Sequence, residues 1–311
     1  MGAYIRRYIM SSSTKQQLVD VLRVKDETMH AAREYLRGEG FTEILPVILS
    51  PITDPLHHDT FDGTVSFYGS PYQLTKSMIL HKQIALRTLP RIYSVSPNVR
   101  MEPAERASLG RYLAEFVQLD LEVRDALRDE IIAVGEGLLV YVLTAIVEHC
   151  SAELARLGRE LAIPETPFER ITFQDAEERF GKGFDDALSE SLSAPAWVID
   201  FPRMVREFYD REDPQRAGVL LDMDLVYPEG YGEALSGGER EHTLQRVVRR
   251  LEQDAIDKER FSQYLGFVAE GLPASAGFGI GIERLTRFVC GLENVEQSRL
   301  FPKVPGRIGA I

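Results

Sequence analysis

A glycine-rich segment near the C-terminus places an arginine at the start of a predicted helix. Residues 277–285 read GFGIGIERL, and apolar residues recur at helical spacing from Leu285 to Leu292. Arg284 therefore lies in the first turn, where the helix dipole disfavours a cation unless an anion binds beside it. A triphosphate would supply that anion. The alternative is a glycine-rich turn with solvated arginines, and the G-x-G-x-G spacing is not the dinucleotide-binding fingerprint.

The segment 116–123, FVQLDLEV, predicts a strand with one apolar face and one functional face. Strict alternation puts Phe116, Gln118, Asp120 and Glu122 on one side and only aliphatic residues on the other. This pattern indicates a sheet that lines a polar cleft. The alternative is an antiparallel strand whose polar face meets solvent, and the phenylalanine on the polar face favours the cleft.

A strand–loop–strand unit comes directly before this segment. Arg100 and Glu102 end one predicted strand, residues 103–110 form a polar loop, and Arg111 leads into the next strand. Arginines at the base of such a loop are suited to clamp a nucleotide, because a guanidinium binds two phosphate oxygens at once. The alternative is an ordinary charged hairpin.

Two carboxylates and an arginine surround a glycine turn further along the chain. Asp224 and Glu233 flank the turn that contains Gly230 and Gly232. Such a pair suits magnesium, which binds carboxylate and phosphate oxygens. Arg240 follows two more glycines, and its planar guanidinium suits a carboxylate ligand. A surface charge cluster is the alternative for Arg240.

His57 and His58 lie in the predicted loop 51–64, beside Asp54 and Asp59. Histidines in such a loop are candidate acid–base groups or metal ligands. No cysteine or further histidine stands at the spacing of a zinc site, so we expect solvated loop histidines.

Composition limits the class of protein. The chain has 311 residues, of which 44% are hydrophobic and 27% charged, with a net charge of −12. It lacks the basic stripe of a dedicated nucleic-acid-binding protein. Cys150 and Cys290 are too few for a disulfide framework, so a reducing, cytoplasmic compartment is expected. The apolar run 131–147 contains Glu136, which predicts a buried core helix and not a membrane span.

The order of the predicted elements indicates an α+β fold. One domain over residues 1–311 fits this order, with a helical excursion at 127–195. Pro46 places its strand at an edge or an interface, since proline donates no ladder hydrogen bond. Helices are predicted over 14–38, 127–157 and 243–255, and strands over 41–49, 91–97, 116–123, 197–201, 222–235 and 275–282.

In combination, these segments resemble the class II aminoacyl-tRNA synthetases of the aspartyl and asparaginyl branch. The strand with Pro46 resembles motif 1, residues 100–122 resemble motif 2 and residues 277–285 resemble motif 3. The resemblance covers nearly the whole chain and implies a catalytic core with an antiparallel sheet flanked by helices, without the anticodon-binding domain. A closer resemblance is to the archaeal-type asparagine synthetases, through 49–55, 77–83, 208–212, 231–241 and 301–306.

The resemblance implies a role for each matching residue. Lys76 matches the lysine of aspartyl-tRNA synthetases, whereas a histidine is expected in the archaeal-type synthetases, and this departure concerns how the substrate is oriented. The implied catalytic residues are Arg100, Gln118 and Arg284. The implied ATP contacts are Arg100, Glu102, Arg111, Phe116 and Arg284. The implied aspartate contacts are Asp54, Lys76, Gln118, Asp120, Arg240 and Gly279, and the implied magnesium ligands are Asp224, Glu233 and Ser236.

The resemblance also implies an activity, that of an AMP-forming aspartate–ammonia ligase. Such an enzyme makes asparagine from L-aspartate, ammonia and ATP through a β-aspartyl-adenylate. A homodimer through residues 14–50 is implied. We do not expect tRNA as a partner, because the chain is acidic and no segment resembles the anticodon-binding domain of these synthetases. Two alternatives remain: an adenylate-forming ligase that transfers aspartate or a similar acid to tRNA or another amine, and an inactive nucleotide-binding paralogue.

Overall fold

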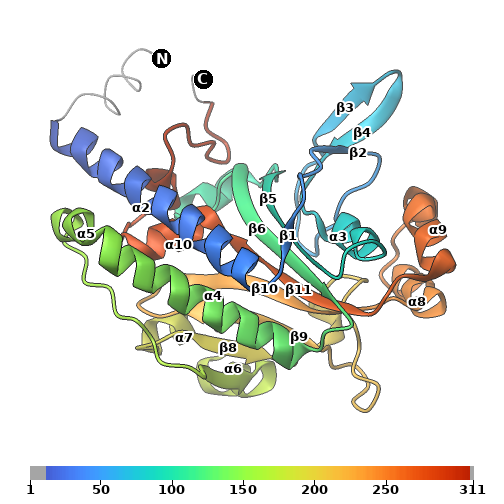
Figure 1. Ribbon diagram of the computed structural model, residues 1–311. Coiled ribbons are helices and arrows are strands. Elements are labelled where there is room, and N and C mark those ends of the chain that lie inside the picture. The colour runs from blue at the N-terminus through green and yellow to red at the C-terminus, as the bar shows by residue number, and fades with distance from the viewer. Residues whose placement is uncertain (1–11, 309–311) are drawn as a thin grey trace.

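The computed structural model describes residues 12–308, and a large sheet organises them (Figure 1). Neighbouring strands in the sheet are antiparallel, except that β1 pairs with β5 and β7 with β8 in parallel. The α+β prediction is therefore confirmed, with a mixed sheet flanked by helices. Among the described residues the strand order is β1 (Thr42–Glu43), β5 (Arg91–Val99), β6 (Glu115–Arg124), β11 (Ser275–Gly281), β10 (Gly232–Arg240), β9 (Asp222–Tyr227), β8 (Ala196–Ile199) and β7 (Glu169–Thr172).

Three helices cover one face of this sheet: α2 (Ser12–Gly38), α4 (Arg128–His149) and α10 (Ile282–Val289) (Figure 1). The aliphatic face of β6 points toward them, so Leu119 and Leu121 join the main hydrophobic core. The polar face of β6 is thereby turned to the opposite side, as its alternation predicted. This division leaves one side of the sheet free to form the floor of a site.

The remaining elements complete the fold around the large sheet. A small sheet is built from β2 (Leu49–Ser50), β4 (Ser70–Leu74) and β3 (Thr64–Phe67). The other helices are α3 (Ile79–Ala85), α5 (Ser151–Leu157), α6 (Phe173–Phe180), α7 (Asp185–Ser191), α8 (Leu244–Gln253) and α9 (Ser262–Gly271), with short 3-10 turns at η1 (Ala104–Leu109), η2 (Arg203–Val205), η3 (Lys258–Phe261) and η4 (Val295–Ser298).

Three predicted elements differ from the structure in detail. The strand predicted over 222–235 is two strands, β9 and β10, joined by the turn that contains Gly230. The strand predicted over 41–49 is divided into β1 and β2, and Pro46 lies between them because it cannot donate to a ladder. The helical excursion predicted over 127–195 contains one strand, β7, which pairs with β8 at the end of the sheet.

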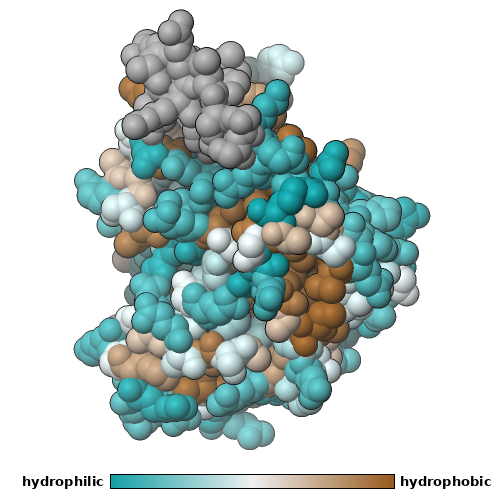
Figure 2. All heavy atoms as spheres, turned by 90° about the vertical axis from the view of Figure 1, so that its left-hand side faces the viewer, coloured by the Kyte–Doolittle hydropathy of each residue, from teal (hydrophilic) through white to brown (hydrophobic). Residues whose placement is uncertain are grey.

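Helix α4 is long and apolar enough to cross a membrane by length and composition, and half of its most apolar window is buried in the protein. Glu136 lies on its buried side, where it accepts hydrogen bonds from Trp197 Nε1 at 2.9 Å and from the Phe168 amide at 3.1 Å. These contacts agree with the predicted core helix. On the face turned toward the viewer in Figure 2, hydrophilic residues predominate and hydrophobic residues form separate patches.

The glycines of β11 allow its neighbours to approach closely. A methyl group at Gly277 would overlap the Leu121 carbonyl oxygen and the Glu122 carboxylate on β6. Any larger residue there would push the two strands apart. The strand that carries the glycine-rich segment can thus lie flat against β6 and bring the start of α10 to the polar side.

Candidate active site

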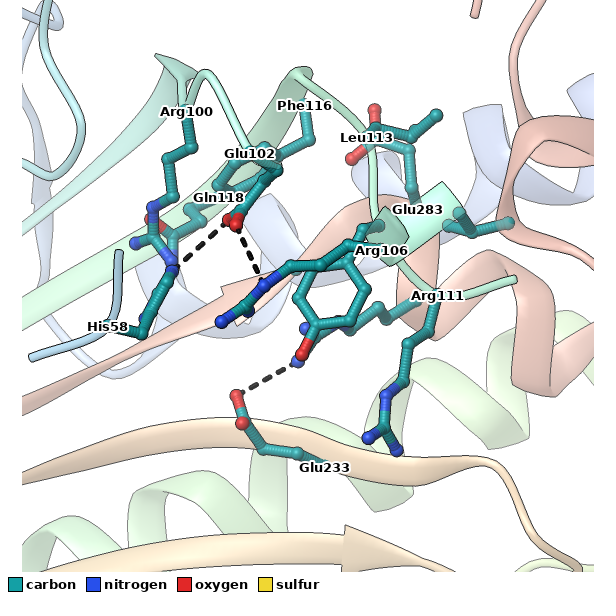
Figure 3. Close-up of a pocket in the computed structure, with 15 residues that line it drawn as sticks. His58, Arg100, Glu102, Arg106, Arg111, Leu113, Phe116, Gln118, Glu233 and Glu283 are labelled. Atoms are coloured by element: carbon teal, nitrogen blue, oxygen red, sulfur yellow. Dashed lines mark hydrogen bonds and ion pairs between the residues drawn. The ribbon is translucent and has the colours of Figure 1, made fainter. Parts of the chain in front are cut away.

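A cavity of about 360 Å³ opens over β6 and β11 (Figure 3). Phe116 and Gln118 reach it from β6, and Gly279 lies in its floor. The guanidinium carbon of Arg100 lies 5.1 Å from the centroid of the Phe116 ring. An aromatic ring beside a fixed cation can stack a nucleobase and bind the phosphate that follows it. The structure thus brings the predicted ATP-binding residues Arg100 and Phe116 together.

Glu102 closes one end of this cavity. Its Oε1 lies 3.2 Å from His58 Nε2, and its Oε2 lies 3.4 Å from Arg106 Nε (Figure 3). The His58 side chain is one-third exposed and lines the cavity. The expectation of two fully solvated loop histidines is therefore wrong for His58. The loop from 51 to 63 folds over the site and brings this side chain in.

Arg284 lies in the first turn of α10, as predicted. Its Nη1 donates to Glu233 Oε1 at 3.0 Å, and both side chains line the cavity. The Arg284 guanidinium also lies over the Tyr112 ring, 5.7 Å from the centroid. The negative charge of Glu233 offsets the positive charge of Arg284, which the positive end of the helix dipole disfavours. Arg111 lines the same cavity, and its guanidinium forms an ion pair with Asp186.

A second cavity of about 180 Å³ adjoins the first and is more polar. Arg240, predicted to bind a carboxylate, lines it but is already engaged. Its Nε donates to Glu122 Oε1 at 3.1 Å, its Nη1 to Asp210 Oδ1 at 2.9 Å and its Nη2 to the Gly277 carbonyl at 2.9 Å. Burial raises the pKa of Asp210 to about 8, against the lowering effect of Arg240. The two cavities share His58, Arg100, Gln118, Glu233 and Gly279.

Asp54 is buried on another side of the second cavity. Its Oδ2 accepts from the Tyr209 hydroxyl at 2.8 Å, and its Oδ1 accepts from the Leu56 amide at 3.0 Å. Burial raises the pKa of Asp54 to about 6, and the nearby Glu207 adds to the rise. The predicted Asp54 and Asp120 thus both line this cavity.

The oxygen donors predicted for magnesium lie together. Asp224 on β9 stands directly opposite Ser236 on β10, and Glu233 lies near the start of β10. Burial raises the pKa of Asp224 to about 7, with Arg206 opposing the rise and Glu233 adding to it. Two carboxylates and a hydroxyl fit magnesium if phosphate oxygens complete its shell. Arg206 Nη2 lies 2.7 Å from Asp224 Oδ1, so this carboxylate also serves an ion pair.

The prediction for Lys76 does not match the geometry. Its Nζ donates to Thr60 Oγ1 at 2.9 Å and to Asp62 Oδ1 at 3.0 Å, and it lines neither of the two cavities. The lysine that reaches the second cavity is Lys82, on α3, whose Nζ lies 3.1 Å from Asp120 Oδ1. The physical reason is helical geometry: α3 turns Lys82 onto the face that packs against β6, while Lys76 precedes the helix.

Several side chains of the second cavity received no role from the sequence: Lys82, Arg206, Glu207, Tyr209 and Asp210. Lys82 carried a usable signal, because a lysine among the apolar residues of a short helix must find buried partners. The charges of segment 206–210 are typical of a surface loop, and the resemblance through 208–212 gave none of its residues a role.

Comparison with known proteins agrees with this geometry. A family model described as tRNA synthetases class II (D, K and N) matches residues 3–305. An asparagine–tRNA ligase of Pyrococcus abyssi is 30% identical over 304 residues, or 93% of this chain and 69% of that protein. One from Thermococcus gammatolerans is 29% identical over 310 residues, or 94% of this chain and 70% of that protein. Asparaginyl-tRNA synthetase from Pyrococcus horikoshii, complexed with asparaginyl-adenylate, superposes with a TM-score of 0.86 at 27% identity, covering 94% of this chain and 70% of that one.

These relatives correct the predicted activity. They are named for joining asparagine to tRNA, so the prediction of an aspartate–ammonia ligase in asparagine biosynthesis is wrong. The expectation that tRNA is not a partner is wrong for the same reason, as is ammonia as the expected nucleophile. The homodimer through residues 14–50 stays a prediction. What the family model and the shared catalytic fold establish together is that this chain belongs to the class II tRNA synthetases of the D, K and N group.

Proposed function

We propose that this chain activates an amino acid with ATP as an aminoacyl-adenylate and transfers the aminoacyl group to tRNA. The observation that carries the proposal is the junction of the two cavities. Arg100, Gln118 and Gly279 line both the larger cavity, which has the aromatic platform, and the smaller polar one. A carboxylate in the small cavity and an α-phosphate in the large one would meet at these residues.

The first step follows from this arrangement. An oxygen of the amino-acid carboxylate attacks the α-phosphorus, the bond to the β-phosphate breaks, and pyrophosphate leaves. Arg100 lies at the junction and would stabilise charge on the α-phosphate, while Phe116 stacks the adenine. Arg284, at the positive end of α10, would release Glu233 and bind the outer phosphates of ATP in its place. Magnesium held by Asp224, Glu233 and Ser236 would neutralise phosphate charge.

In the second step a hydroxyl of the tRNA terminus attacks the acyl carbon. The C–O bond to AMP breaks, AMP leaves with the electron pair, and the hydroxyl proton is lost to a nearby base. The names of the relatives support tRNA as the acceptor. The adenylate bound in a structure 27% identical to this chain supports the intermediate.

The proposal is tested by pyrophosphate exchange into ATP, with asparagine, aspartate and then the other proteinogenic amino acids. Charging of unfractionated tRNA with the activated amino acid follows. We expect exchange that is lost in Arg100→Ala, because Arg100 is the one arginine or lysine among the described residues that line both cavities. Arg87→Ala is the matched control, since Arg87 forms a surface ion pair with Glu270 at 2.8 Å. Absence of exchange with every amino acid would contradict the proposal.

A further inference from the structure

The small polar cavity has carboxylates from several separate parts of the fold. Asp120 comes from the sheet, on β6, whereas Asp54 comes from the loop that precedes β3. Glu207 and Asp210 line the cavity from the segment that leads into β9. A cavity of this size with so many acids must balance their charge through its own cations or through its ligand.

The cavity's own deep cations are already engaged by carboxylates. The Nε, Nη1 and Nη2 atoms of Arg240 donate to Glu122, Asp210 and the Gly277 carbonyl, respectively. Lys82 Nζ lies within 3.4 Å of Asp120 Oδ1 and of two backbone carbonyls. An acidic ligand side chain would therefore compete with protein carboxylates for both cations. The cavity disfavours a second carboxylate on its ligand.

Among the described residues, two acids on the loop side form no ion pair, although the charge of Arg100 partly offsets the rise that burial causes in the pKa of Asp54. Asp54 accepts from the Tyr209 hydroxyl and the Leu56 amide, and Glu207 Oε1 accepts from the His57 amide at 2.9 Å. Within the described part of the chain, neither carboxylate forms an ion pair. The raised pKa of Asp54 reflects burial first and the charge of Glu207 second. An added cation would relieve this repulsion.

A separate observation on the sheet side points to the same ligand chemistry. Asp120 is 98% buried, and its Oδ2 has no hydrogen-bond partner among residues 12–308, although Oδ1 is bound by Lys82. Because buried polar atoms are normally hydrogen-bonded, an unpartnered carboxylate oxygen in a ligand cavity indicates that the ligand supplies the donor. The α-ammonium of an amino acid would satisfy it.

A metal ion fits these acids less well than an ammonium group. No cluster of three or more histidine, cysteine, aspartate or glutamate side chains in the described structure converges to hold a metal. The acceptors instead come from Asp120 on the sheet side of the cavity and from Asp54 and Glu207 on its loop side. Two ammonium groups, held apart by a short carbon chain, match that distribution.

Resting on the adenylation step of the proposed function, we propose that this cavity binds a second alkylammonium group, seated against Asp54 and Glu207, in addition to an α-ammonium at Asp120. Two kinds of ligand would supply this second alkylammonium group. It is the side chain of a diamino acid that is activated, or it belongs to an amine acceptor. In the second case a C–N bond replaces the C–O bond to AMP, AMP takes the electron pair, and two protons leave the ammonium group.

Calorimetry with ligand pairs that differ by one terminal ammonium group tests the site directly. The pairs are L-2,4-diaminobutyrate with L-2-aminobutyrate, L-ornithine with L-norvaline, and L-lysine with L-norleucine, each titrated into the full chain with a non-hydrolysable magnesium-ATP analogue. We expect the charged member of at least one pair to bind at least ~10-fold more tightly, as for one charge-assisted hydrogen bond. For the acceptor source, n-butylamine is compared with n-butanol in the presence of asparagine. Equal or weaker binding of every charged member overturns the proposal.

Two variants locate the effect. Glu207→Gln keeps the size of the side chain and an acceptor oxygen for the His57 amide but removes the charge, so it should weaken the charged ligand ~10-fold and leave the uncharged ligand unchanged. Asp54→Asn removes the charge and also one of the two acceptors for Tyr209 and Leu56, so it should weaken the charged ligand ~10-fold more than the uncharged ligand. Asp129→Asn is the matched control, because Asp129 is 70% exposed on α4 and pairs with Arg170. Equal losses for both members of a pair, in both variants, would contradict an ammonium site.

The outcomes separate this inference from the proposed function. Pyrophosphate exchange with asparagine, together with no preference for any charged ligand, would retain the ligase and overturn the ammonium site. A preference for a charged ligand without exchange for any amino acid would retain the ammonium site and overturn the ligase. Mass spectrometry then distinguishes the sources, since a diamino acid is found in the adenylate and an amine acceptor in the final amide.

Discussion

Replacement of Gly279 by alanine should damage catalysis much more than folding. Gly279 lies on β11 in the floor shared by both cavities. A Cβ atom there would stand 2.9 Å from Asp120 Oδ1 and 2.9 Å from Gln118 Nε2. Ordinary contact begins at 3.4 Å, so each of these atoms must retreat by about 0.5 Å. Both are ends of side chains and can move without shifting the backbone.

The displaced atoms hold the site together, which sets the size of the effect. Asp120 Oδ1 lies 3.1 Å from Lys82 Nζ, and Gln118 Oε1 accepts from Asn98 Nδ2 at 2.6 Å. A misplacement of ~1 Å near the chemistry costs ~100-fold in rate. We therefore expect kcat/KM for adenylation to fall ~10-fold to ~100-fold, equal to ~1.4–2.7 kcal/mol. The fold should lose only ~1 kcal/mol, at the lower end for overpacking.

Pyrophosphate exchange and thermal unfolding measure the two effects on the same preparations. Gly277→Ala is the contrasting variant, because its methyl group would overlap the Leu121 backbone carbonyl and should prevent normal folding. Retention of adenylation within ~3-fold in Gly279→Ala would refute the reasoning, since a difference that small is under ~0.7 kcal/mol. If Gly279→Ala impaired folding as severely as Gly277→Ala does in thermal unfolding, that result would also refute the reasoning.

Three further changes have defined outcomes. Phe116→Leu removes the ring beside Arg100 and should raise KM for ATP ~5-fold to ~10-fold, measured by exchange at varied ATP, because stacking contributes ~1 kcal/mol. Trp197→Phe deletes the donor to buried Glu136 and should lower the free energy of unfolding by ~1–3 kcal/mol in urea titration, while an unchanged midpoint would contradict it. Asp54 has its pKa raised from 3.8 to about 6 by burial, so its stabilising contribution is complete below pH ~4 and is lost as pH rises through ~6. Relative to Asp54→Asn, the wild-type chain should lose stability across that window, and parallel pH curves for the two proteins would disprove the assignment.

The catalytic face of the sheet was predictable from local periodicity. A strand period of two puts Phe116, Gln118 and Asp120 on one face whatever the rest of the chain does. The glycines and the helix period from Leu285 likewise place Arg284 at the start of α10. These patterns depend only on covalent geometry and on the separation of apolar from polar residues. Both positions can therefore be predicted from the sequence alone.

The activity was not predictable from the same residues. The proposed activation of a carboxylate with ATP would be common to amide-forming and tRNA-charging enzymes, so the residues that support it do not distinguish them. The acceptor is chosen by groups elsewhere, so the resemblance led to the wrong reaction. The relatives named for tRNA ligation made that correction.

Within the site, only the tertiary structure decided which charges are available. Lys76 and Lys82 are close in sequence, yet Lys76 turns to Asp62 while Lys82 enters the cavity beside Asp120. Arg240 follows the glycines of β10 as predicted, but Asp210, from the segment that leads into β9, already pairs with it. Periodicity says which face a side chain occupies. Its partner depends on which segments pack together, because burial makes every charge seek the counter-charge that folding brings within reach.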